Sequence, residues 1–414
     1  MKCLEANSAL NQYDIFDKVD ILCDAGPAEL PDTASVTVNV SEKKQFNFKG
    51  GVYVSQSGEG SVEISTGLNN ALGRAEKFDF EVVKGHERSS TYTLAWNQPR
   101  VRNTDVDIST RAFQQMSCSK RLSSFDLTAR GLSVTAQGGG PATVDYSLVW
   151  REIRDPTRLA SRAVRQHLGH SLKSAVTYTI QQDDRDRPVR PTSGTLWRVR
   201  SELAGIGADP NMSRFFKQEA EAQTARSLAP GVTLAVSGKL GAIIPIGDAA
   251  RKDPRGTCIA DRFFLGGVGS LRGFETHGAG PSDERRPPKN PEAADAEGII
   301  ARDAIGGDFL AVGFAAIQLE PAFEKLRDIG VYAHVFANAG TCVPLGTPGT
   351  KESGRAPMTR HELLDTLRAS IGMGLVFPLP VGNIEVNYVK TLRSRTHDRV
   401  KDGLQVGLAT AMSM

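Results

Sequence analysis

Most of the chain repeats one pattern, in which apolar residues occupy every second position. Phe46, Phe48 and Val52 alternate with polar residues or glycine, and the same period returns at residues 172–180 and 384–388. Successive side chains on a strand face opposite sides, so each segment has one apolar face and one polar face. About sixteen such segments follow one another from residue 45 to the C-terminus, each about as long as a tilted membrane strand.

Two all-β architectures fit this pattern, a transmembrane β-barrel and a soluble β-sandwich. The polar faces carry many charged residues at mid-strand, which suits a water-filled barrel lumen. No helical pattern interrupts the series, and turn clusters such as Ser57-Gly-Glu-Gly separate its members. These features favour the barrel, and the sandwich remains open on periodicity alone.

Residues 1–44 follow a different pattern. Residues 4–16 have helical spacing, and residues 19–22 and 34–40 have the pattern of two short strands joined by a turn. We therefore predict a small α/β element, which is too short to bury a core of its own.

The composition excludes several classes of protein. Of the 414 residues, 40% are hydrophobic, and no apolar run has the length that a membrane helix needs. Fifty Lys and Arg residues balance 47 Asp and Glu residues, which argues against a nucleic-acid binder. Five widely spaced cysteines without a C-x-x-C argue against a disulfide framework or a zinc site. No catalytic motif is found, so we expect no enzyme, no metal and no cofactor.

The most informative stretch begins at Ile259 and reads Ile-Ala-Asp-Arg-Phe-Phe-Leu-Gly-Gly-Val-Gly-Ser-Leu-Arg-Gly-Phe. Its glycines allow a left-handed backbone or a close approach to another wall. Arg272 can place a forked donor among acceptors in a confined space. The run is not a phosphate-binding loop, because neither G-K-[ST] nor a helix follows it. The hydrophilic residues 273–302 predict an exposed loop.

This run resembles the hallmark of the BamA superfamily of outer-membrane assembly barrels, and most closely its mitochondrial branch, the core barrel of the sorting and assembly machinery. The resemblance implies a bacterial surface antigen-type domain, with sixteen antiparallel transmembrane strands, over residues 45–414. It implies a lumenal loop at about residues 256–302, and a partial POTRA-like segment at residues 1–44. The implied location is the mitochondrial outer membrane, in contact with its lipid bilayer.

The resemblance also implies the site. The loop tip would consist of Leu271, Arg272, Gly273 and Phe274, with Gly266 and Gly267 before them. In such barrels, polar residues on the strands after the loop hold the loop arginine. Four candidates stay open as partners of Arg272, namely Asp308, Gln318, Glu320 and Asn338.

The C-terminus supplies a second signal. Residues 401–408, Lys-Asp-Gly-Leu-Gln-Val-Gly-Leu, resemble the β-signal of mitochondrial barrel precursors. The family implies a weak seam between the first strand, about residues 46–55, and the last, about residues 403–412. Its residues would include Gly50, Gly51, Val52, Gly403, Val406, Gly407 and Leu408, of which Val406 and Leu408 should face lipid. Gln405 and Gly407 should face the wet lumen, where we expect a charge at position 405 to be tolerated.

The function implied by the resemblance is insertion of β-barrel precursor proteins through this seam, together with accessory subunits of the machinery. The alternative is a polypeptide-translocating pore of the same superfamily, of secretion or plastid import type. A second alternative comes from another functional class, a soluble β-sandwich binding module. Nucleic acid is not expected as a partner.

Overall fold

The computed structural model describes residues 2–25, 33–54, 60–85, 89–188, 190–207, 212–247, 256–287, 301–321, 323–345, 364–379 and 382–409. Over these ranges, no helix is both long enough and apolar enough to span a membrane.

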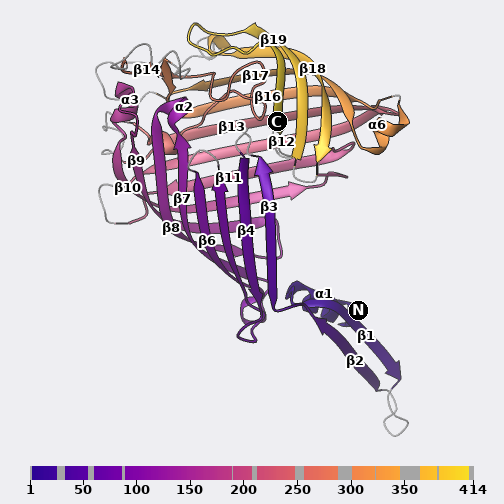
Figure 1. Cartoon of the computed structure of the whole chain (residues 1–414). Coiled ribbons are helices and arrows are strands. Elements are labelled where there is room, and N and C mark those ends of the chain that lie inside the picture. Colours follow the sequence, from indigo (N-terminus) through magenta and orange to yellow (C-terminus); the bar gives the residue numbers. More distant parts are fainter. Residues whose placement is uncertain are drawn as a thin grey trace.

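Sixteen strands form one sheet in which each strand is antiparallel to its neighbours (Figure 1). The sheet confirms the all-β barrel fold, because a β-sandwich would divide its strands between two packed sheets. The first eleven strands are β3 (Phe46–Val54), β4 (Gly60–Asn69), β5 (Lys77–Gly85), β6 (Ser90–Gln98), β7 (Asp107–Ser119), β8 (Phe125–Gln137), β9 (Ala142–Arg154), β10 (Gly169–Asp183), β11 (Gly194–Ala204), β12 (Phe215–Ala229) and β13 (Val232–Pro245). The last five are β16 (Phe309–Leu319), β17 (Tyr332–Val343), β18 (Arg368–Leu379), β19 (Gly382–Arg393) and β20 (Gly403–Ala409).

The connections between these strands contain short helical turns. These are η1 (Val101–Asn103), α2 (Lys120–Ser123), α3 (Arg162–Arg165) and α6 (Glu324–Asp328).

The outer face of the sheet is apolar. On β4, Val62 and Ile64 are exposed while Ser61, Glu63 and Ser65 between them are half-buried. The same face continues around the sheet with Leu94, Leu132, Val144, Tyr178, Leu240, Ile317, Val335, Met373, Tyr388 and Val406, all of them exposed. An apolar surface of this extent is unfavourable in water and suits lipid, so the strands are transmembrane.

The connection between β13 and β16, residues 246–308, contains the lumenal loop, whose residues 259–274 lie inside the barrel. It contains η2 (Ile259–Asp261) and a hairpin of β14 (Ser282–Glu284) and β15 (Arg302–Ala304). Leu265, Leu271 and Phe274 join a buried cluster with wall residues such as Phe215 and Ile243. The prediction that residues 273–302 form an exposed loop was therefore wrong at its start, because apolar burial draws this part into the lumen.

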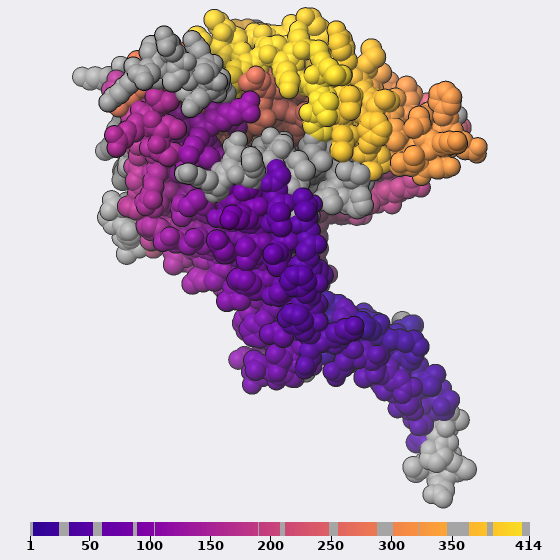
Figure 2. Space-filling model, in the orientation of Figure 1, coloured from indigo at the N-terminus to yellow at the C-terminus, as the bar shows by residue number. Residues whose placement is uncertain are grey.

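Residues 1–44 form a separate unit, seen as a narrow indigo arm in Figure 2. Helix α1 (Lys2–Gln12) lies beside a two-stranded antiparallel sheet of β1 (Phe16–Ala25) and β2 (Ala34–Glu42). The predicted helix and two strands are confirmed. Every residue of β2 is exposed, so this unit lacks a core there. One helix and one hairpin do not by themselves identify a POTRA domain, so that part of the assignment stays a prediction.

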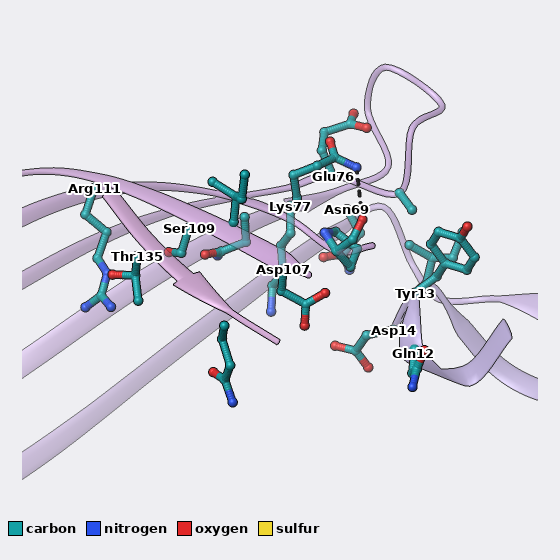
Figure 3. A pocket seen from close by; sticks show the side chains of 17 residues that line it. Gln12, Tyr13, Asp14, Asn69, Glu76, Lys77, Asp107, Ser109, Arg111 and Thr135 are labelled. Carbon is teal, nitrogen blue, oxygen red and sulfur yellow. Dashed lines mark hydrogen bonds between the residues drawn. The ribbon is translucent and has the colours of Figure 1, made fainter. Parts of the chain in front are cut away.

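A cavity of about 300 Å³ lies where the α1–β1 turn meets the rim of the barrel (Figure 3). Tyr13 and Asp14 line it from the turn, and Lys77 and Asp107 line it from the barrel. Beside it, Lys43 pairs with Asp14 at 2.5 Å, and the Arg100 guanidinium lies 5.5 Å from the centroid of the Tyr13 ring. The contact between Arg100 and Tyr13 joins the rim to the arm, while the pair of Lys43 and Asp14 lies within the arm.

A pair of cysteines offers a test of the arm. The Sγ atoms of Cys3 on α1 and Cys23 on β1 lie 2.8 Å apart, and both residues are free thiols. Mild oxidation with glutathione disulfide should therefore link them, which would stabilise the arm by about 3 kcal/mol. Peptide mapping without reductant should find this link, while Cys342, which is 1% exposed, stays reduced. Oxidation of Cys23 only to mixed disulfides would contradict the packing of α1 on β1.

Candidate functional site

Arg272 at the tip of the lumenal loop forms a forked ion pair with Glu385 on β19. Its Nε donates to Glu385 Oε2 at 2.9 Å, and its Nη2 donates to Oε1 at 2.8 Å. The side chains of Arg272 and Glu385 are 2% and 6% exposed. A bidentate pair in such a dry site fixes the orientation of both groups, and the loss of one partner would leave the other charge buried.

Aromatic rings and polar neighbours surround this pair. The Arg272 guanidinium lies 4.4 Å from the centroid of the Phe314 ring and 5.3 Å from that of Phe336. Asn387 donates to Glu385 at 2.8 Å and contacts His334 Nε2 at 2.7 Å. The stacked rings exclude water from the guanidinium, and the amide restrains the carboxylate, so the ion pair is preorganised.

The backbone of the loop tip is held by the last three strands. Ser370 on β18 donates to the Arg272 carbonyl oxygen at 2.6 Å, and Thr391 on β19 donates to that of Gly273 at 3.1 Å. The Gly273 amide donates to Gln405 Oε1 on β20 at 3.2 Å. Three neighbouring strands, including the last, are thus bonded to two consecutive residues of the loop.

Glycine is required at two places in this arrangement. Gly273 has φ +90°, and a Cβ there would approach Ser370 Cβ to 2.9 Å. Gly266 has φ +114°, and a Cβ there would overlap the Glu275 carbonyl oxygen. Gly267 also has a positive φ, whereas Leu271 and Phe274 anchor the tip by burial at 0% and 2% exposure. The loop-tip residues predicted from the sequence therefore lie together.

The partner of Arg272 is Glu385, which was not among the four candidates. Asp308 binds Thr257 and the Leu345 amide, and Glu320 binds Arg190 at 3.0 Å. Both carboxylates lie at the ends of β16, where other groups satisfy them.

The two amide candidates lie elsewhere around the loop. Gln318 is buried on β16, and its Oε1 has no partner in the described residues. Asn338 lies 2.5 Å from the Ser370 hydroxyl, which donates its proton to Arg272, so Asn338 reaches the loop tip through Ser370.

A signal for Glu385 existed in the sequence. Among the residues of β16 to β20 it is the only Asp or Glu, and the period of two places it on the inner face. It was missed because the candidates were sought on the two strands directly after the loop.

The residues of the proposed seam lie on β3 and β20, the two ends of the sheet. In the described part of the chain, β3 pairs with β4 alone and β20 pairs with β19 alone. Val406 on β20 is 62% exposed, which agrees with its predicted lipid-facing side, and Val52 on β3 is 77% exposed. Residues 55 and 410–412 of the predicted strands lie outside the described residues.

The seam glycines differ in their surroundings. A Cβ on Gly50 would meet only the Glu63 carbonyl oxygen, at 4.0 Å, and the neighbouring Gly51 pairs with Glu63. Gly403 begins β20 with φ +94° and has open space around it.

Two further positions of β20 complete the predicted seam. A Cβ on Gly407 would come within 2.6 Å of Val268 in the lumenal loop, so this glycine allows the loop to lie against the last strand. Leu408 pairs with Ile384 through its backbone, and its side chain is not among those described.

Gln405 requires a correction. It faces inward as predicted, yet it is 2% exposed and binds the Gly273 amide. The lumen beside β20 is filled by the loop, so the wet surroundings expected for Gln405 were wrong, and the tolerance of a charge at this position stays a prediction.

Comparisons with known proteins agree with this geometry. An Omp85 superfamily domain matches residues 70–412. The sorting and assembly machinery component 50 homolog of Homo sapiens is 32% identical over 420 residues, covering 98% of this chain and 81% of that protein. A SAM50-like protein of Schizosaccharomyces pombe is 28% identical, with 97% and 80% covered. BamA from Haemophilus ducreyi lacking POTRA domains 1–3 has a similar fold, with a TM-score of 0.75 at 18% identity, covering 97% of this chain and 77% of that one.

The ion pair predicts that Arg272→Lys loosens the loop. Lysine keeps the charge but loses the fork, and a hydrogen bond to a charged group contributes about 1.5–3 kcal/mol. When samples are heated stepwise before a denaturing gel, the variant should lose the mobility of the folded barrel at a lower temperature than the wild-type protein does. The matched control is Arg327→Lys, because Arg327 and its partner Glu324 have side chains that are 51% and 81% exposed, so this pair should matter by less than about 1 kcal/mol. Equal effects of the two substitutions would mean that the buried fork does not stabilise the loop.

Two arginine substitutions one residue apart test the facing of β20. Val406→Arg places a charge in lipid at about 2–4 kcal/mol, so the variant should be extracted by carbonate. Gln405→Arg should remain in the membrane but release the loop tip, which becomes sensitive to added protease because the bond to Gly273 is lost. If the two variants behaved alike in both assays, the register of β20 against the loop would be incorrect.

Proposed function

The chain belongs to the Omp85 superfamily, and we propose that it inserts β-barrel precursor proteins into the mitochondrial outer membrane, where it resides. The similarity to a human sorting and assembly machinery component 50 homolog, over nearly the whole chain, supports this function. The protein acts as an assembly factor and breaks no covalent bond. Its proposed partners are barrel precursors, accessory subunits of the machinery and the surrounding lipid.

The observation that carries the proposal is the linear order of the sheet. Sixteen strands run from β3 to β20, and the described residues record no ladder that joins these two. In hydrocarbon, each unpaired backbone N–H or C=O costs several kcal/mol, so an open edge is a strong site for another strand. We call the precursor protein that is being inserted the client. A client strand that pairs with such an edge satisfies the hydrogen-bond groups of its own backbone and those of the edge at once.

The features of the two edges suit transient pairing. Gly50 and Gly51 on β3, and Gly403 and Gly407 on β20, offer no side chains for cross-strand contacts. Glycine weakens a strand because it adds backbone entropy and packs nothing. In the proposed cycle, client hairpins accumulate at the seam and leave as a closed barrel, while the loop holds β18 to β20 in position.

The alternative of a translocating pore has less support. The lumenal loop fills one side of the lumen with buried apolar residues, among them Leu265, Leu271 and Phe274. A polypeptide that passes through the lumen would have to displace this cluster. A client that enters sideways from the seam leaves it in place.

We assign residues 45–414 to the insertase barrel and residues 1–44 to a partial POTRA-like segment. The support is the separation of the sheets, since β1 and β2 pair with each other and β3 begins at Phe46. In the described residues β2 pairs with β1 alone, which leaves a backbone edge for a client strand before it reaches the barrel.

Locking the seam tests the function. A cysteine placed in residues 50–54 and another in residues 406–409 should form a disulfide where the Cα atoms come within about 4.4–6.8 Å, so several registers are scanned. Once crosslinked, the protein should stop inserting clients into isolated mitochondria, and reductant should restore insertion. The native cysteines are replaced beforehand.

The matched control carries its disulfide one strand away from the seam. Gly51→Cys with Glu63→Cys joins β3 to its existing partner β4, so it adds a covalent bond without closing the sheet. This variant should insert clients at the normal rate. Normal insertion by the fully locked seam variant would refute the lateral route.

A further inference from the structure

Asp261 joins the lumenal loop to the barrel wall far from the loop tip. It lies in η2, is 4% exposed, and its carboxylate binds two cations of the wall. Arg151 Nη1 on β9 donates to its Oδ2 at 2.8 Å, and Lys173 Nζ on β10 donates to its Oδ1 at 3.0 Å. Neither bond involves residues of the tip.

Two more strands complete this contact. Glu202 on β11 pairs with Lys173 at 2.5 Å. Lys217 on β12 donates to the Asp261 carbonyl oxygen at 3.1 Å, and its ammonium group lies 4.5 Å from the centroid of the Phe263 ring. Three strands, β9, β10 and β12, therefore bind one short segment of the loop, and β11 supports the contact through Lys173.

Charge makes this contact specific. The side chains of Arg151 and Asp261 are 5% and 3% exposed, so neither can rely on water for its partner. Burial alone would raise the pKa of Asp261, but Arg151 and Lys173 outweigh it and lower the pKa to about 2. Asp261 is thus ionised at neutral pH, and without it two wall cations would share the single carboxylate of Glu202.

The position of this wall is informative. Counted from β3, the strands β9 to β12 are the seventh to tenth of the sixteen, so they lie opposite the seam in the barrel. The tip residues Arg272 and Gly273 are bonded to β18, β19 and β20, the last three strands. One loop therefore connects the wall opposite the seam to the C-terminal edge of the seam.

We propose that Asp261 is a positioning residue that fixes the far end of this loop, so that the loop acts as a strut across the lumen and sets the position of β20 at the seam. The inference rests on the proposed function, because it assigns the strut a role in client insertion. A strut holds only while both ends are fixed. Release at Asp261 should therefore have the same consequence for β20 as release at Arg272.

The test begins with the loop itself. Asp261→Asn keeps the shape and removes the charge, and Asp261→Glu keeps the charge. In purified protein, hydrogen exchange of the Phe263 and Ala279 amides, which bond to Gly307 and Leu265, should be about tenfold faster in the Asn variant. The Glu variant should restore most of the protection. The control is Glu284→Gln, an exposed acidic residue of the same loop, which should leave these amides unchanged.

Coupling between the two ends distinguishes a strut from two separate stabilising contacts. In mitochondria, Asp261→Asn and Arg272→Lys should each slow client insertion several-fold, and the double variant should be scarcely slower than either single one. If the double variant slowed insertion by the product of the two single effects, the two contacts would be independent and the strut proposal would be overturned. Normal insertion by Asp261→Asn, with slow insertion by Arg272→Lys, would also overturn it while leaving the proposed function intact.

Two results would require a further variant or a further measurement. If Asp261→Asn fails to assemble, Lys173→Gln serves instead, because it removes one of the two cations and should show the same changes at smaller size. Should the wild-type protein insert no clients, the proposed function fails. The exchange of β20 amides then decides the strut, which predicts faster exchange in both end variants and is refuted by unchanged β20 protection.

Discussion

The structure depends on one constraint, that backbone hydrogen-bond groups in hydrocarbon must find partners. A closed barrel meets it by pairing its first and last strands. In this chain β3 and β20 are the two ends of a sixteen-stranded sheet, with no ladder between them in the described residues. The two edges therefore bind another strand strongly, because each backbone N–H or C=O group that finds a partner there removes a cost of several kcal/mol.

An edge that must stay open also needs support from elsewhere. A strand within a closed sheet is positioned by two neighbours, whereas β20 has β19 alone in the described structure. The lumenal loop supplies the missing restraint on β20 through Gln405, which binds Gly273, and it holds β18 and β19 through Ser370 and Glu385. Because these contacts lie inside the barrel, they leave the backbone edge of β20 free for a client.

The sequence predicts the strands well because their period of two reflects the two-sided environment of each strand. It also predicts the loop tip, since glycines and one arginine in an apolar run imply a confined turn. The partner of Arg272 escaped prediction because pairing depends on which strands meet across the lumen, and Glu385 lies 113 positions away. The start of the segment 273–302 and Gln405 were misjudged for a related reason. Polar or glycine-rich character was taken as a sign of water, whereas the loop and the wall satisfy these groups in a dry interior.

The central claim is that a client pairs with the edges of the seam, and disulfide mapping of an arrested client along one of them, β3, tests it most directly. A precursor stalled during import would carry a single cysteine in its last strand, and single cysteines would be scanned along β3 and, as the control, along β10 opposite the seam. The account predicts crosslinks to consecutive positions of β3 in a single register, with none to β10. Crosslinks confined to the inward positions of β10, or spread without register over both strands, would contradict pairing at the seam.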